Sequence, residues 1–190
     1  MTKKILVLAS LAAIALALPA SAVVTRTSTP ATPTGDDNCT GANGAGGGTD
    51  NIAFTETGTI SDANIAVEVA HTWRSDIQMG VSYSVGGGNI ALIDDVGAGN
   101  DNLFVTFDSD NGTTCATACA AAAPCSTAGN AVTCSPSGTL NTFDGQTSPG
   151  TWTIAICDDS SAISGTLNTW SVTLDGTGQL PVELMSFSIE

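Results

Sequence analysis

His71 is the only histidine of the chain and the one side chain whose ordinary pKa suits a general base near neutral pH. A serine hydrolase would need this base, a hydroxyl beside it and an acid that orients the ring. The sequence contains no GxSxG turn or comparable nucleophile signature. His71 also shares its alternating positions with Val67, Val69 and Trp73. We therefore interpret His71 as a buried structural residue and the chain as not an enzyme.

Acidic side chains could serve acid catalysis or metal binding. A glycosidase needs two carboxyl groups that face each other across a cleft, which neighbouring turn residues do not indicate. Calcium takes oxygen ligands clustered on loops, and the segments 94–102 and 108–112 supply them, although neither matches a helix-loop-helix calcium loop. The alternative is a solvated acidic surface. No other cofactor is indicated, and the candidate calcium ligands are Asp94, Asp95, Asp101, Asp108 and Asp110.

Six cysteines, an even number, predict three disulfides in an exported protein. They are Cys39, Cys115, Cys119, Cys125, Cys134 and Cys157. Zinc is the alternative, but the spacings contain no CxxC knuckle. Among the 15 ways to pair six cysteines, we favour pairing within 115–134, which leaves Cys39 for Cys157, because it is the most local choice.

The three tryptophans could form a sugar-stacking platform or belong to the core. Trp73 continues an apolar face, and Trp152 alternates with Ile154 and Ile156, which is the spacing of a core strand. The sequence therefore predicts that Trp73, Trp152 and Trp170 are core residues.

The first 22 residues have the form of a secretory signal peptide. Two lysines precede an apolar run over 5–18, and Ala-Ser-Ala at 20–22 resembles a cleavage site. The apolar run is shorter than the ~20 residues that cross a bilayer, so we expect export without a membrane span. The remaining chain holds two arginines against 18 acidic residues, which argues against nucleic acid and anionic lipid as partners.

The elements that would position these residues are strands. Residues 63–73 and 77–85 alternate apolar and polar side chains, and the short connection between them predicts adjacent strands. Further strands are predicted at 89–93, 103–107, 151–157, 169–174 and 182–189. No convincing helical period occurs outside the signal. The fold class is all-β, a jelly-roll-like β-sandwich over 51–176.

Three other segments have a different character. In residues 23–50, 16 of 28 are Gly, Ser, Thr or Pro, which predicts a flexible arm that Cys39 staples down. The stretch 108–138 reads as an insertion loop ordered by disulfides. The tail 177–190 is predicted either to form a final strand or to pair with an exposed sheet edge of another copy.

Two stretches resemble a known family. "HTWRSDI" at 71–77 and "GTWTIAICDDSSAISGTLNTW" at 150–170 are similar to the P domain, or Homo B domain, of kexin- and furin-like proprotein convertases and secreted bacterial proteases. The resemblance covers about 52–176. It implies a jelly roll without catalytic residues that stabilises a neighbouring protease. The chain departs from the family at "SVGGGN", 84–89, and in its cysteine-rich insertion.

These observations lead to one functional expectation and one alternative. We expect a secreted, extracellular, bacterial accessory or interaction module without catalytic activity, with a protein partner that is a secreted protease or copies of itself. The alternative is a structural subunit of an extracellular or cell-surface assembly, joined through the arm or the tail. A stand-alone hydrolase is disfavoured.

Overall fold

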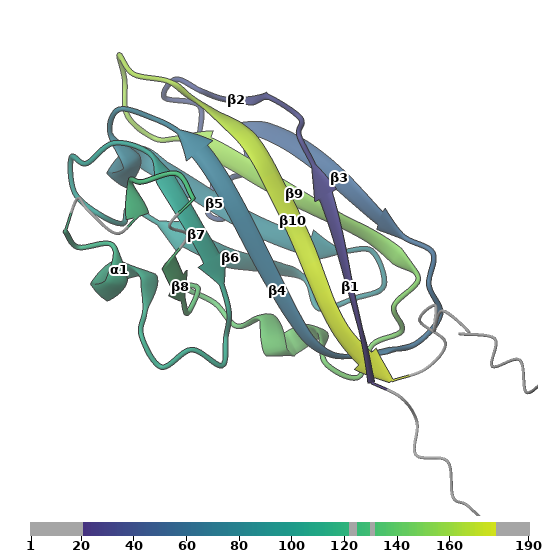
Figure 1. The fold of residues 1–190 in the computed structure, drawn as a ribbon. Helices are drawn as coiled ribbons and strands as arrows, with labels where there is room; N and C mark the ends of the chain where they lie inside the picture. The colour runs from purple at the N-terminus through teal and green to yellow at the C-terminus, as the bar shows by residue number, and fades with distance from the viewer. Residues whose placement is uncertain (1–20, 122–124, 130–131, 178–190) are drawn as a thin grey trace, which may run out of the picture.

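The computed structural model describes residues 21–121, 125–129 and 132–177. In these residues two β-sheets pack face to face around one apolar core, and the sheets form the two layers seen in Figure 1. The chain passes repeatedly from one sheet to the other, as in a jelly roll. The predicted all-β sandwich is confirmed.

The strands of the two sheets pair antiparallel except for β7 and β8, which run parallel. The first sheet contains β1 (Ser21–Ser28), β2 (Thr32–Gly35), β10 (Gly165–Thr177), β4 (Thr59–Ala70), β7 (Leu103–Phe107) and β8 (Val132–Cys134). The second has the order β3 (Gly48–Phe54), β9 (Gly150–Asp158), β5 (Ile77–Tyr83) and β6 (Asn89–Asp94). Short turns of helix in the described connections include η1 (Arg74–Asp76), α1 (Cys115–Ala118) and η2 (Leu140–Phe143).

The core follows from the alternation of the strands. In β4 the side chains from Ala63 to Val69 at odd positions are buried, and those between them are partly or fully exposed. An aromatic cluster fills the space near η2, where Tyr83 stacks on Trp152 with ring centroids 4.7 Å apart and Phe143 meets both rings edge-on.

The prediction that 63–73 and 77–85 form adjacent strands is wrong. β4 pairs with β10 and β7 in one sheet, whereas β5 pairs with β9 and β6 in the other. The chain ends β4 at Ala70 and passes through η1, whose Arg74 side chain is fully buried. A short connection is compatible with a hairpin or with a passage of the chain from one sheet to the other. Here the chain passes to the other sheet, and Arg74 is buried at that passage.

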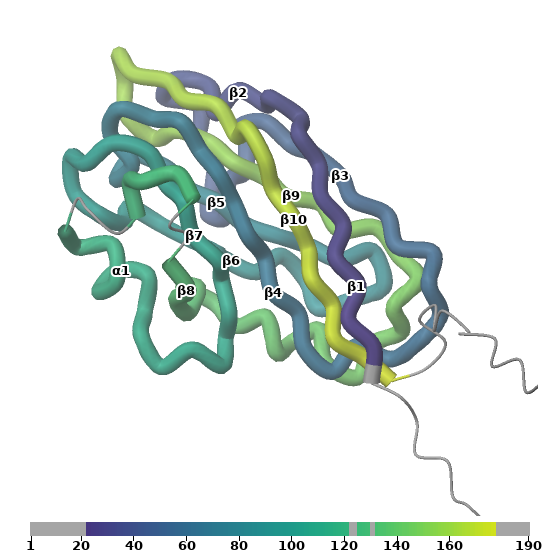
Figure 2. The backbone as a smooth tube through the Cα atoms, viewed as in Figure 1, coloured from purple at the N-terminus to yellow at the C-terminus, as the bar shows by residue number. Residues whose placement is uncertain are grey.

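The segment 23–50 is not a flexible arm, because it forms β1, β2 and the start of β3. β1 and β10 run side by side (Figure 2), and their register places Ser21 opposite Thr177 and Ser28 opposite Trp170. Val and Thr favour extended backbone, and an edge strand needs only one covered face. The Arg26 guanidinium supplies part of that cover, 5.5 Å from the centroid of the Phe54 ring and paired with Glu56. The sandwich therefore begins well before residue 51.

The insertion at 108–138 contains α1 and β8, and two of the three disulfides lie within it. The disulfides join Cys39 to Cys157, Cys115 to Cys134 and Cys119 to Cys125. The Cys39–Cys157 pair and the pairing within 115–134 agree with the sequence prediction, which left the two pairs inside the insertion open, and the disulfides fit an oxidising compartment.

Some predicted features fall outside the described residues. Residues 1–20 of the signal peptide and the tail 178–190, with its predicted strand at 182–189, are among them. Within the described part of the chain, no helix has the length and apolar character needed to cross a membrane.

Candidate functional site

His71, Trp73 and Arg74 lie at one end of the sandwich, where β4 and β9 end and β5 begins. His71 follows β4 directly and keeps its buried face, so its imidazole points between the sheets. Its Nε2 lies 2.6 Å from Asp158 Oδ2, and both side chains are fully buried. The ring Nδ1 accepts the Trp73 backbone N–H at 3.0 Å. Nδ1 therefore carries no proton, and Nε2 carries the ring proton and donates it to Asp158.

This arrangement leaves His71 no nitrogen for a substrate or nucleophile. Asp158 is equally committed, because its Oδ1 accepts the Ser160 N–H at 2.8 Å and its backbone oxygen accepts the Asn38 N–H at 2.9 Å. A general base must present a nitrogen to the proton that it removes. The His71–Asp158 pair instead ties the end of β4 to the end of β9.

Trp73 is not a core residue, so that prediction is wrong. Its side chain is 47% exposed, whereas Trp152 and Trp170 are buried as predicted. β4 ends at Ala70 and the backbone at Trp73 has turned to φ −151° and ψ 79°, so the strand alternation no longer applies there. The indole rests on the chain at Gly99, where a Cβ atom would lie 2.6 Å from the ring.

Arg74 is buried without a carboxylate partner among the described residues. Its Nη1 donates to Ser126 Oγ at 3.0 Å, and its Nη2 donates to the carbonyl oxygens of Cys119 and Ala121, the latter at 3.0 Å. Burial lowers the pKa of Arg74. These acceptors belong to the insertion, so Arg74 fastens the Cys119–Cys125 loop to the end of the sandwich.

The five candidate calcium ligands do not form one site. Asp94, Asp95 and Asp101 lie at the His71 end, at the end of β6 and just before β7, whereas Asp108 and Asp110 follow β7 at the opposite end. Five residues of extended strand separate the two groups. In the described ranges no set of three or more His, Cys, Asp or Glu side chains is placed to hold a metal ion.

Two carboxylates outside the candidate calcium ligands, Asp76 and Asp159, lie beside Asp95. Asp159 donates its backbone N–H to the Asp76 carbonyl at 3.0 Å, and its side chain accepts from Gln78 Nε2 at 3.1 Å. Burial, the charges of Asp159 and Asp94, and a side-chain hydrogen bond to Asp159 together raise the pKa of Asp95 to about 6. Burial and the charge of Asp158 raise the pKa of Asp76. These carboxylates repel one another.

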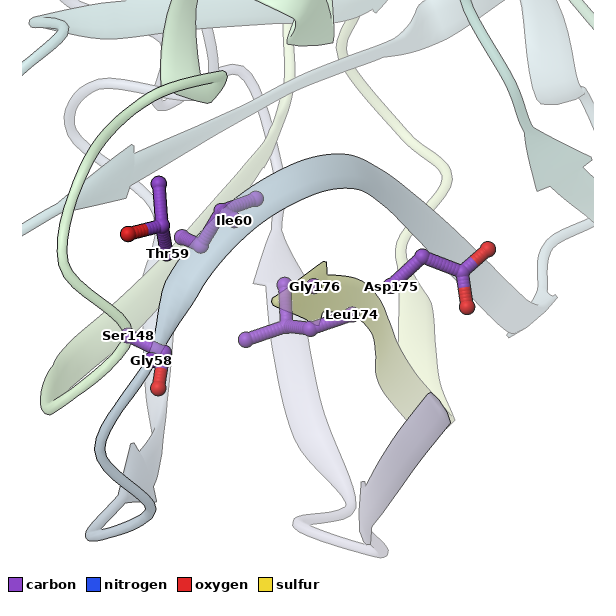
Figure 3. Close-up of a pocket in the computed structure, with 7 residues that line it drawn as sticks. All are labelled: Gly58, Thr59, Ile60, Ser148, Leu174, Asp175 and Gly176. Atoms are coloured by element: carbon purple, nitrogen blue, oxygen red, sulfur yellow. The ribbon is translucent and has the colours of Figure 1, made fainter. Parts of the chain in front are cut away.

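A pocket lies at the opposite end, between the start of β4 and the end of β10 (Figure 3). Its cavity volume is about 10 Å³, within about 190 Å³ of space that includes open solvent. Its lining consists of Gly58, Thr59, Ile60, Ser148, Leu174, Asp175 and Gly176. Pockets that enclose drug-sized ligands usually measure ~300–1,000 Å³. This one is smaller and contains neither a histidine nor a cysteine.

Comparison with known proteins finds similarity in solved structures alone. No family model matches the chain, and no curated protein matches it. The fold is similar to a crystal structure of the Aeromonas sobria serine protease in complex with its chaperone, with 13% identity over 85% of this chain and a TM-score of 0.52. It is also similar to the serine protease of Aeromonas sobria solved alone, with 13% identity over 84% of this chain and a TM-score of 0.50.

The coverage of the matched chains is much lower than that of this chain. In both structures the similarity spans 28% of the other chain. This chain therefore shares the fold of little more than a quarter of a longer, protease-containing structure.

Proposed function

We propose that the chain is a secreted, non-catalytic accessory module of the P-domain type, which stabilises or assists a secreted protease in the extracellular space. The observation that carries the proposal is the closed His71–Asp158 pair. The one histidine of the chain spends both ring nitrogens on structural hydrogen bonds inside the sandwich. This end of the sandwich is therefore available as a binding surface, while its histidine is occupied by Asp158 and the Trp73 backbone.

Two further observations support a partnership with a protease. The sandwich matches about a quarter of a chain in structures of a serine protease, which is the relation expected of an accessory domain. The residues that resemble the P domain are also those that build this end of the fold. "HTWRSDI" supplies the histidine and the crossing between sheets, and "CDDS" supplies its aspartate partner.

The test combines a binding experiment with an activity experiment. The mature chain, immobilised, is exposed to culture medium of the producing cell, and any retained protease is purified. We expect that adding the chain in stoichiometric amount lengthens the half-life of this protease at raised temperature. We expect no hydrolysis of ester or peptide substrates by the chain itself.

The matched control for hydrolysis is His71→Gln, compared at equal folded fraction. Hydrolysis by the parent chain that disappears in this variant at unchanged melting temperature would contradict the proposal. Size-exclusion chromatography with and without residues 181–190 tests the alternative function. A multimer that depends on these residues, with no protease retained, would favour a structural subunit of an extracellular assembly.

A further inference from the structure

Trp73 is a large apolar side chain held outside the core. Among the described residues only two other large apolar side chains, Val23 and Val85, are similarly exposed, and both lie toward the opposite end of the sandwich. A tryptophan offers more contact area than any other side chain and loses few rotatable bonds when it is covered. Its exposure is therefore the feature of this end that most needs a physical reason.

The backbone that carries Trp73 is fixed from three sides. Its N–H donates to the His71 ring, its carbonyl accepts the Asp76 N–H at 3.1 Å, and the next N–H, of Arg74, donates to the Asn100 carbonyl at 2.9 Å. The indole itself lies against Gly99. Such an anchor is already ordered before a partner arrives, which lowers the entropy cost of binding.

The surroundings of Trp73 are acidic, and the one arginine at this end, Arg74, is buried and bonded to neutral groups. Asp76, Asp95 and Asp159 lie together at this end, and Asp101 is in the loop that supports the indole. The described residues contain two arginines. Arg74 points inward to the carbonyl groups of the insertion. Arg26, on β1, is paired with Glu56. The charge of this end is left for a binding partner to neutralise.

We propose that Trp73 and the carboxylates of Asp76, Asp95, Asp101 and Asp159 form a docking surface for a basic segment of a protein partner. An arginine or lysine of that segment would lie over the indole face as a cation–π contact, with its charge shared by the carboxylates. The raised pKa values of Asp76 and Asp95 agree with this assignment, because a cation would relieve the repulsion among these groups. The inference rests on the proposed function only in requiring a protein partner.

The test uses the full mature chain and a fluorescein-labelled heptapeptide of alternating arginine and glycine, with binding measured by fluorescence polarisation. We expect a salt-sensitive complex, and no binding of the same peptide with glutamine in place of arginine. Trp73→Ala should weaken binding roughly tenfold. The double variant Asp95→Asn/Asp159→Asn should weaken it about as much.

Two variants at the opposite end serve as matched controls. Val85→Ala removes a side chain as exposed as Trp73, and Asp108→Asn/Asp110→Asn changes the net charge by the same amount as the test pair. Both should bind like the parent chain. Melting temperatures ensure that each variant is compared in its folded state.

The proposal is overturned if Trp73→Ala binds unchanged, or if the control variants weaken binding as much as the test variants. It is also overturned if calcium at matched ionic strength displaces the peptide where magnesium does not, since the carboxylates would then form a metal site. Protease stabilisation that survives Trp73→Ala would refute this surface and leave the proposed function intact. Peptide binding that depends on Trp73, with no protease partner found, would support this surface and refute the proposed function.

Discussion

The Cys39–Cys157 disulfide should contribute more stability than any other cross-link of the chain. It joins residues 118 positions apart, whereas Cys119 and Cys125 are 6 apart. Closing a loop in the unfolded chain costs entropy that grows with the logarithm of loop length. The expected contributions are about 5 kcal/mol for the long loop and about 2 kcal/mol for the short one.

The structure gives a second reason for this order. The backbone beside Cys39 bonds to the end of β9, where the Asn38 and Cys39 N–H groups both donate to the Asp158 carbonyl. Loss of the disulfide should loosen these bonds and the His71–Asp158 pair with them. Alanine at positions 39 and 157 should therefore cost at least the loop term, because native contacts weaken as well.

The assay is denaturant unfolding without reductant, followed by tryptophan fluorescence, on the two double Cys→Ala variants. Before unfolding, mass spectrometry of the parent chain should show a mass six hydrogens below the reduced form and no cysteine open to alkylation. Equal losses in the two variants, or a larger loss at 119 and 125, would refute the loop argument. Peptide mapping that links Cys39 into the insertion would refute the pairing itself.

Three further variants test single side chains. His71→Ala should lower the free energy of unfolding by about 1–3 kcal/mol, from lost packing and an unpaired Asp158, and should weaken binding at Trp73 less than Trp73→Ala does, because the other backbone bonds that hold Trp73 remain; unchanged stability with lost binding would place His71 in a site. Arg74→Met should destabilise the chain by about 2–3 kcal/mol, because three acceptors lose their donor, and should expose the 119–126 loop to limited proteolysis. Asp95 keeps its proton to about pH 6 in the folded chain but releases it near its ordinary pKa of 3.8 when unfolded, so stability should fall as pH rises between these values. Asp95→Asn should remove that fall, which solvent screening limits to about 1 kcal/mol, and a parent chain whose melting temperature rises over this range would contradict the sign.

The strands that carry the core could be predicted from sequence because their side chains alternate. β4, β5, β7, β9 and β10 each contain several alternating positions, and the structure buries the apolar set in each. The same alternation places His71 in the interior. Period-two patterns report which face is covered, so they identify strands and faces well.

Pairing partners could not be predicted in the same way. An alternating strand looks alike whether its neighbour along the chain lies beside it or in the opposite sheet, so alternation cannot tell that β4 and β5 belong to different sheets. The pattern does not reveal β1, because threonine and proline dominate its surroundings and its cover comes from distant residues such as Phe54. The insertion strand β8 has three residues, too few for a pattern.

Among the residues of the candidate site, those on an alternating strand are predictable from sequence and those held by distant partners are not. His71 is visible in the sequence, but its partner Asp158 is 87 positions away, and no local pattern connects them. Arg74 resembles a surface residue of a turn, and only the folded insertion reveals the carbonyl groups that bind it. The alternation places Trp73 in the core only if the strand continues to residue 73, whereas β4 ends at Ala70.

The outward position of Trp73 bears on what this end of the sandwich does. Three side chains of one short segment point in different directions. His71 and Arg74 turn inward and are hydrogen-bonded, while Trp73 between them turns outward. The inward pair uses the groups with catalytic chemistry to hold the two sheets and the insertion together. What faces solvent is an indole on a fixed backbone beside carboxylates that repel one another. An exposed indole on a fixed backbone, beside carboxylates of one sign, is what the proposed docking of a basic segment requires.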